Sequence, residues 1–115
     1  MTKFRVGIVG YGIIAEEHAN AWEDIPETEL IGIADLAESR RQAAQEQHDC
    51  EVFGSDEEMF SSIKLDIVTV ATQTPAHLRS VLLAFDHDCH VICEKSLALS
   101  PEDAGKMVNT AAGRS

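Results

Sequence analysis

The chain has 115 residues, the length of one domain, and its 44% hydrophobic and 25% charged residues are typical of a folded globular protein. The formal net charge of −11 disfavours nucleic acid and anionic membrane surfaces as partners. No stretch has the pattern of a signal peptide or the length of a membrane span, so we expect a cytoplasmic protein. Three cysteines without a CxxC pair disfavour a disulfide framework.

A short strand and a glycine turn open the chain, in residues 6–15, VGIVGYGIIA. The β-branched residues indicate a strand buried on both faces, and GYGIIA fits the GxGxxA turn that holds a dinucleotide pyrophosphate. Gly10 would allow the tight turn, Gly12 would let the backbone approach the phosphates, and Ala15 would let the next helix pack closely. The N–H groups that begin this helix, predicted over 13–24, would face the anion.

The second predicted strand, residues 29–35, ends in Asp35, about 20 residues after the glycine turn. A carboxylate at this spacing binds the adenosine ribose, so the two features together predict a dinucleotide site. Because the Asp35 carboxylate would repel a 2′-phosphate, the sequence favours NAD over NADP. Arg40 and Arg41, in a helix predicted over 37–48, leave NADP open because an arginine here could pair with that phosphate.

Three further strand–helix units follow. We predict strands at 51–54, 65–71 and 89–94, a helix at 56–62 capped by Ser55, a helix ending near Phe85, and a last helix at 101–112. This alternation indicates one α/β domain with a doubly wound parallel sheet, strand order 3-2-1-4-5, and helices on both faces. The ligand crevice then lies at the carboxyl ends of strands one and four, beside the glycine turn, Asp35, residues 72–77 and Glu94–Lys95.

A zinc site is the alternative to consider for His87, Cys89, His90 and Cys93, which crowd together in the sequence. The alternation of side chains along a strand puts Cys89 and Cys93 on one face and His90 on the other. We therefore expect these thiols to be packed in the protein interior, with no metal site.

Three segments carry a family resemblance: VGIVGYGIIAEEHANAW, VATQTPAH and HVICEKSLALSPEDAGKMV. Together they resemble the N-terminal cofactor-binding domain of the Gfo/Idh/MocA oxidoreductases, which include glucose–fructose oxidoreductase and inositol dehydrogenase. The resemblance covers residue 5 to about residue 112. The EK strand end with its SPEDA helix, and the VAT…H turn, are more specific than the glycine motif.

The resemblance implies roles for the residues at matching positions. The pyrophosphate would lie along Gly10, Gly12, Ile13 and Ile14, and the adenosine ribose on Asp35. The nicotinamide side would be formed by Ala71, Thr72, Thr74, His77 and Glu94. Lys95 would be the catalytic residue, positioning or polarising the substrate oxygen whose carbon exchanges hydride.

The sequence departs from the family pattern at three positions: Ser96 replaces the proline of EKP, Gln73 replaces the proline after VAT, and Asp88 replaces a helix-ending glycine. The family's substrate pocket and acid–base residues lie mostly in a second, mainly β domain, which this sequence lacks.

We therefore expect an NAD(P)-binding domain of an oxidoreductase that acts on a sugar- or polyol-type hydroxyl and is inactive alone. A non-catalytic dinucleotide sensor, or a domain for another nucleotide such as coenzyme A, remains open. We also expect self-association, through strand five or through the face that would meet the second domain.

Overall fold

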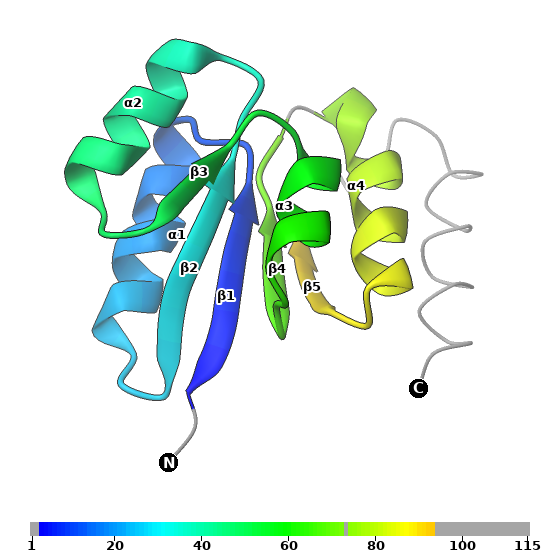
Figure 1. Ribbon diagram of the computed structural model, residues 1–115, viewed down its shortest axis with the longest axis horizontal. Helices are drawn as coiled ribbons and strands as arrows, with labels where there is room; N and C mark the ends of the chain where they lie inside the picture. The colour runs from blue at the N-terminus through cyan, green and yellow to red at the C-terminus, as the bar shows by residue number, and fades with distance from the viewer. Residues whose placement is uncertain (1–2, 73, 94–115) are drawn as a thin grey trace.

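The computed structural model describes residues 3–72 and 74–93. In this part of the chain five parallel strands alternate with four helices, and the sheet has the predicted order β3-β2-β1-β4-β5 (Figure 1). The elements are β1 (Phe4–Val9), α1 (Ile13–Asp24), β2 (Thr28–Ala34), α2 (Glu38–Gln47), β3 (Glu51–Phe53), α3 (Asp56–Ser62), β4 (Ile67–Val70), α4 (Thr74–Asp86) and β5 (His90–Cys93).

The last three strands, β3, β4 and β5, are shorter than the sequence predicts, β1 begins earlier, at Phe4, and β2 is shifted by one residue, whereas α1 and α3 have the predicted bounds. The strand predicted over 65–71 is regular only from Ile67, and just before it Asp66 bonds Arg5 through both its backbone N–H and its side chain. The Arg5 N–H donates to Asp66 Oδ2 at 2.8 Å, where a regular ladder would use a backbone carbonyl. The helix predicted over 101–112 lies outside the described residues.

The turn that ends α4 requires a left-handed residue, and Asp88 takes this conformation with φ of 59°. Glycine is the usual residue at such a helix end because a side chain there is strained by roughly 1–2 kcal/mol. The turn is held by hydrogen bonds from the N–H groups of Asp88 and Cys89 to the carbonyls of Phe85 and Ala84. The position identified from the sequence is therefore a helix end, with aspartate in glycine's place.

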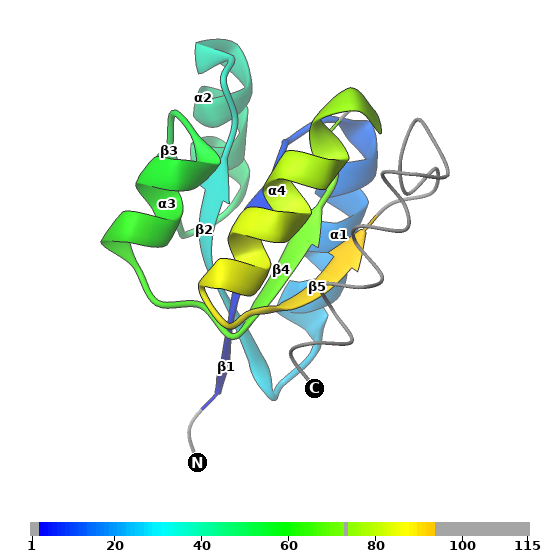
Figure 2. The same ribbon diagram turned by 90° about the vertical axis from the view of Figure 1, so that its right-hand side faces the viewer.

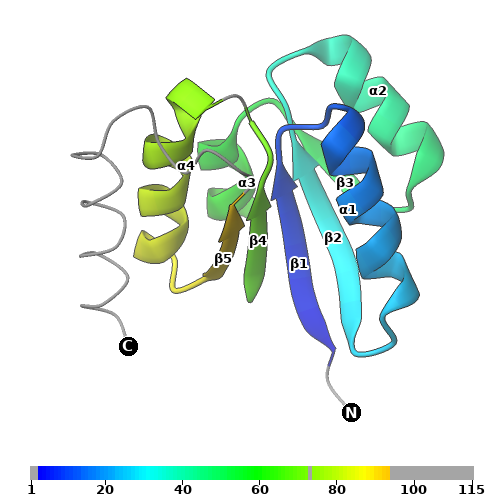
Figure 3. The same cartoon turned by 180° about the vertical axis from the view of Figure 1, so that it is seen from behind.

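Each face of the sheet has its own apolar core. On one face α1 and α2 cover β1 and β2, and the core consists of Val6, Ile8, Ala15, Ala19, Leu30, Ile33 and Ala44 around Tyr11. On the other face α3 and α4 pack over a core that includes Phe53, Met59, Phe60, Val68 and Val81. Figure 2 shows α1 and the α3–α4 pair on opposite sides of the sheet, and Figure 3 shows α1 and α2 over its β2–β3 side. None of the described helices is long and apolar enough to span a membrane.

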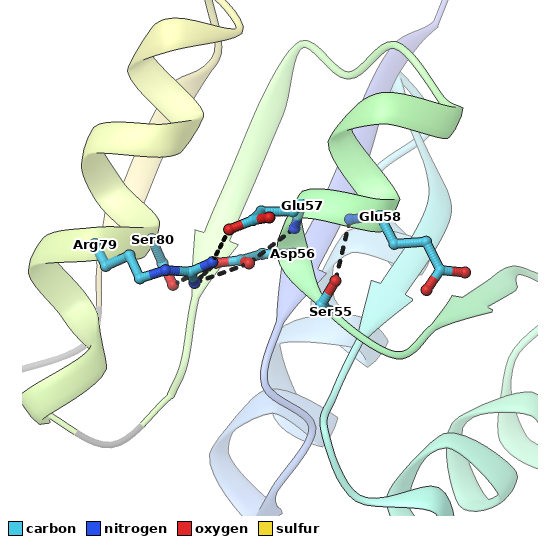
Figure 4. Close-up of polar contacts among 6 residues, drawn as sticks. All are labelled: Ser55, Asp56, Glu57, Glu58, Arg79 and Ser80. Atoms are coloured by element: carbon cyan, nitrogen blue, oxygen red, sulfur yellow. Dashed lines mark hydrogen bonds and ion pairs between the residues drawn. The ribbon is translucent and has the colours of Figure 1, made fainter.

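A buried carboxylate joins α3 to α4 at the carboxyl edge of the sheet (Figure 4). Ser55 caps α3 as predicted, since its Oγ accepts a hydrogen bond from the Glu58 N–H at 3.1 Å. The next residue, Asp56, is buried and accepts hydrogen bonds at 3.0 Å from the Arg79 guanidinium and from the Ser80 hydroxyl. Asp56 therefore ties the first turn of α3 to the second turn of α4, which lies beside it.

We expect Asp56→Asn to lower the free energy of unfolding by about 1–3 kcal/mol, because the buried Ser80 hydroxyl and the Arg79 guanidinium lose their charged acceptor. Glu57 also pairs with Arg79, but its side chain is 67% exposed. Glu57→Gln is the matched control and should change the free energy by less than about 0.5 kcal/mol. Urea unfolding followed by the fluorescence of Trp22 measures both; equal losses would contradict a special role for Asp56.

Candidate functional site

The turn after β1 requires glycine at its first position. Gly10 has φ of +88°, and its N–H donates to the Ala34 carbonyl at the end of β2. A Cβ atom here would lie 2.8 Å from Thr72 Cγ2 and 3.0 Å from the Thr72 backbone nitrogen. The tight turn predicted for Gly10 is therefore present, and it packs directly against the segment that follows β4.

Gly12 has a different reason to be glycine. It is the N-cap of α1, it makes no side-chain cap, and a Cβ atom added to it would meet nothing within 4 Å. The start of α1 is therefore open at Gly12 and has no side-chain cap, and an open helix N-terminus is the arrangement that binds phosphate. Ala15, one turn later, is 1% exposed and packs into the core, as predicted for close helix packing.

Asp35 lies directly after β2 and holds the glycine turn from the side. Its side chain is 7% exposed, and its Oδ2 accepts a hydrogen bond from the Tyr11 N–H at 2.7 Å. Its Oδ1 accepts from the Ala37 N–H at 2.8 Å, and Arg40 Nη1 lies 3.7 Å from Oδ2. A carboxylate can accept about four hydrogen bonds, so this group retains capacity for ligand hydroxyls.

These features line one groove of about 1180 Å³ at the carboxyl edge of the sheet. Of the residues proposed from the sequence, the groove lining includes Gly10, Gly12, Ile14, Asp35, Ala71 and Thr72. Ile13 and Thr74 begin α1 and α4, and His77 lies in the first turn of α4; their side chains are outside the described part of the structure. Glu94 and Lys95 lie outside the described residues.

The groove also contains residues that the sequence did not single out. Leu36, next to Asp35, is 85% exposed and presents an apolar side chain to the groove. Asp56, Arg79 and Ser80 form a further part of its wall. Arg79 and Asp56 are 23 positions apart, so no local pattern could have indicated their contact. The hydrogen bond to Asp56 raises the pKa of Arg79, which therefore keeps its charge at the groove.

The groove of this protein, whose net charge is −11, is lined by charges of both signs. Arg40 and Arg79 line it, together with the carboxylates of Glu16, Asp35 and Asp56. Arg41 donates to the carbonyls of Asp35 and Leu36 at 2.9 and 3.2 Å, which steadies the loop after β2. The arginines therefore place positive charge at the groove within an acidic protein, where Asp35 and Asp56 partly offset it, and the α1 N-terminus adds its dipole.

The predicted packing of the cysteines is confirmed for Cys89. It is buried, its Sγ lies 3.3 Å from the Leu65 carbonyl oxygen, and burial raises the pKa of its thiol to about 11. Residues 3–72 and 74–93 contain no group of three or more possible metal ligands.

Comparisons with known proteins identify the family of this chain. The model described as "Oxidoreductase family, NAD-binding Rossmann fold", of the Gfo/Idh/MocA family, matches residues 4–115. The chain is 34% identical over 109 residues to D-glucoside 3-dehydrogenase of Escherichia coli, and 33% identical over 107 residues to inositol 2-dehydrogenase of Rubrobacter xylanophilus. These matches cover 93% and 92% of this chain and 31% of each relative, so the chain spans about a third of their length.

Solved structures show the same architecture. The WlbA dehydrogenase from Chromobacterium violaceum, in complex with NADH and UDP-GlcNAcA, has a TM-score of 0.94 and 30% identity, over 99% of this chain and 33% of that one. An oxidoreductase from Agrobacterium radiobacter, in complex with NAD+, L-tartaric acid and magnesium, has a TM-score of 0.93 and 27% identity, over 98% and 33%. The glycine turn, Asp35 and the family match thus agree, and the chain belongs to the Gfo/Idh/MocA oxidoreductases, of which it carries the NAD-binding Rossmann domain.

Proposed function

We propose that this chain holds NAD in the groove for hydride exchange with a hydroxyl-bearing carbon of a sugar or polyol. The observation that carries the proposal is the open space above Gly12, beside the buried carboxylate of Asp35. The N–H groups at the start of α1, which have no side-chain cap, would bind the pyrophosphate in that space. The carboxylate would accept hydrogen bonds from the ribose diol. The substrate class is supported by the relatives named as glucoside and inositol dehydrogenases.

Different residues of the groove would bind different parts of the dinucleotide. The amides at the start of α1 would bind the pyrophosphate, and Asp35 would accept hydrogen bonds from the adenosine ribose. Leu36 offers an apolar surface for the adenine, and Ala71 and Thr72 would border the nicotinamide. When bound, the nicotinamide supplies the hydride donor or acceptor.

The nicotinamide end includes residues outside the described structure. We keep Thr74, His77 and Glu94 as proposed contacts on that side, and Lys95 as the proposed catalytic residue. The ammonium group of Lys95 would donate a hydrogen bond to the substrate oxygen and stabilise the charge that develops on it.

NAD is the proposed cofactor rather than NADP. The Asp35 carboxylate is buried and held by two backbone N–H groups, so moving it aside for a 2′-phosphate would break two hydrogen bonds. Arg40 lies 3.7 Å from this carboxylate. The negative charge of Asp35 therefore partly offsets the positive charge of Arg40, which a 2′-phosphate would need as its partner.

The chain alone is proposed to bind NAD without turnover, to self-associate, and to act in the cytoplasm. The free thiols of Cys50 and Cys89 agree with a reducing compartment. Light scattering that shows a strict monomer at high concentration would count against self-association.

A fluorescence titration tests the cofactor. We expect saturable binding of NADH. NADPH should bind about tenfold or more weakly, since its 2′-phosphate would bring further negative charge close to the Asp35 carboxylate. Coenzyme A, which lacks a nicotinamide, serves as the competing nucleotide and should not displace NADH at equal concentration. Absence of NADH binding would contradict the proposed function, and equal affinities would contradict the preference for NAD.

Two glycine variants separate folding from binding. Gly12→Ala adds a methyl group to open space, so the unfolding midpoint should stay close to that of the wild type while NADH affinity falls about tenfold or more. Gly10→Ala should instead destabilise the fold by at least about 1–2 kcal/mol, because its φ is positive and the methyl group would meet the Thr72 backbone. Unchanged NADH affinity in Gly12→Ala would contradict phosphate binding at this turn.

A further inference from the structure

A series of hydrogen-bonded side chains links the glycine turn to the C-terminal ends of two helices. Tyr11, between Gly10 and Gly12, is 5% exposed, and its hydroxyl oxygen lies 3.0 Å from His48 Nε2. His48 is the C-cap of α2, and its Nδ1 lies 2.7 Å from Glu23 Oε1, near the end of α1. The chain of contacts therefore runs from the turn to the C-terminal ends of both helices on this face.

The contacts leave the Tyr11 side chain little freedom. Its hydroxyl also contacts Gln47 Oε1, and its ring meets the His48 imidazole edge to face, with centroids 5.8 Å apart. The His48 side chain is 2% exposed, and both its ring nitrogens have partners, so its orientation is fixed. Burial raises the pKa of Tyr11, so the hydroxyl stays protonated at neutral pH.

The backbone of Tyr11 is held as firmly as its side chain. Its N–H donates to Asp35 Oδ2 at 2.7 Å, and Asp35 is itself held by the Ala37 N–H. The residue at the centre of the glycine turn is thus bonded at one end to the loop after β2 and at the other to the end of α2. Neither neighbouring glycine has a side chain that could restrain the turn, so Tyr11 is the residue of the GYG segment that can do so.

We propose that Tyr11 is a positioning residue for the dinucleotide, held by His48 and Glu23, and that this relay keeps the glycine turn in its pyrophosphate-binding conformation. This inference rests on the proposed function. If the anchor is lost, the turn spends part of its time in other conformations, and the apparent dissociation constant rises by the inverse of the competent fraction. Ligands that do not reach the turn are unaffected.

Tyr11→Phe removes only the hydroxyl and is the first test. We expect NADH and ADP-ribose, which both contain the pyrophosphate, to bind about 3- to 10-fold more weakly, the range for one buried hydrogen bond. Adenosine, which lacks the pyrophosphate, should bind as to the wild type, measured by ligand-observed NMR. Equal weakening of all three ligands, or unchanged NADH affinity, would overturn the proposal.

A double-mutant cycle tests the relay itself. His48→Leu should weaken NADH binding as Tyr11→Phe does, and the double variant should be no weaker than either single variant, because each breaks the same contact. His90→Leu makes the same change at an exposed position on β5 and should leave NADH affinity unchanged. Urea unfolding followed by Trp22 fluorescence shows whether each variant folds. If His48→Leu does not fold, the comparison of NADH and ADP-ribose with adenosine in Tyr11→Phe decides whether the proposal holds.

The outcomes separate the two proposals. Additive losses in the cycle would overturn the relay while NADH binding by the wild type still supports the proposed function. A wild-type chain that binds no NADH would overturn both.

Discussion

The hydrogen bond from the Tyr11 N–H to Asp35 joins two neighbouring strand ends and determines the geometry of the whole site. It brings the glycine turn after β1 next to the loop after β2, and the same carboxylate accepts from Ala37 as α2 begins. The groove therefore has a rigid side on which the α1 amides and the Asp35 carboxylate keep a constant separation. A dinucleotide needs this, because its phosphates and ribose bind to different elements at once.

The acidity of the protein does not prevent an anion site, because the site depends on local groups. The first N–H groups of α1 are uncapped, whereas α3 is capped by Ser55 and α2 begins beside a backbone N–H bonded to Asp35. Arg40 and Arg79 add positive charge at the groove, and each is oriented by an aspartate. The two aspartates keep the guanidinium groups at the groove, and the negative charge of each aspartate partly offsets the positive charge of its arginine.

The parts of the fold that local patterns determine were predictable. The α1 and α3 bounds follow from a glycine turn and a Ser55 cap, and the sheet order follows from the alternation of strands and helices. Contacts between distant positions were not predictable, since no spacing rule links Asp56 to Arg79 or Tyr11 to His48. The early start predicted for β4 was wrong, and just before the strand Asp66 bonds Arg5 through its carboxylate, a contact that strand periodicity does not register. The roles of Glu94 and Lys95 stay predictions.

Amide chemical shifts during a titration with NADH test the central claim most directly, because they report the site residue by residue. The predicted result is large shifts for the amides of residues 10–15 and 35–37, with those of Lys64 and its neighbours at the opposite edge of the sheet unchanged. Shifts confined to that opposite edge, or saturating NADH that leaves the amides of Tyr11 and Gly12 unmoved, would contradict a dinucleotide site at the glycine turn.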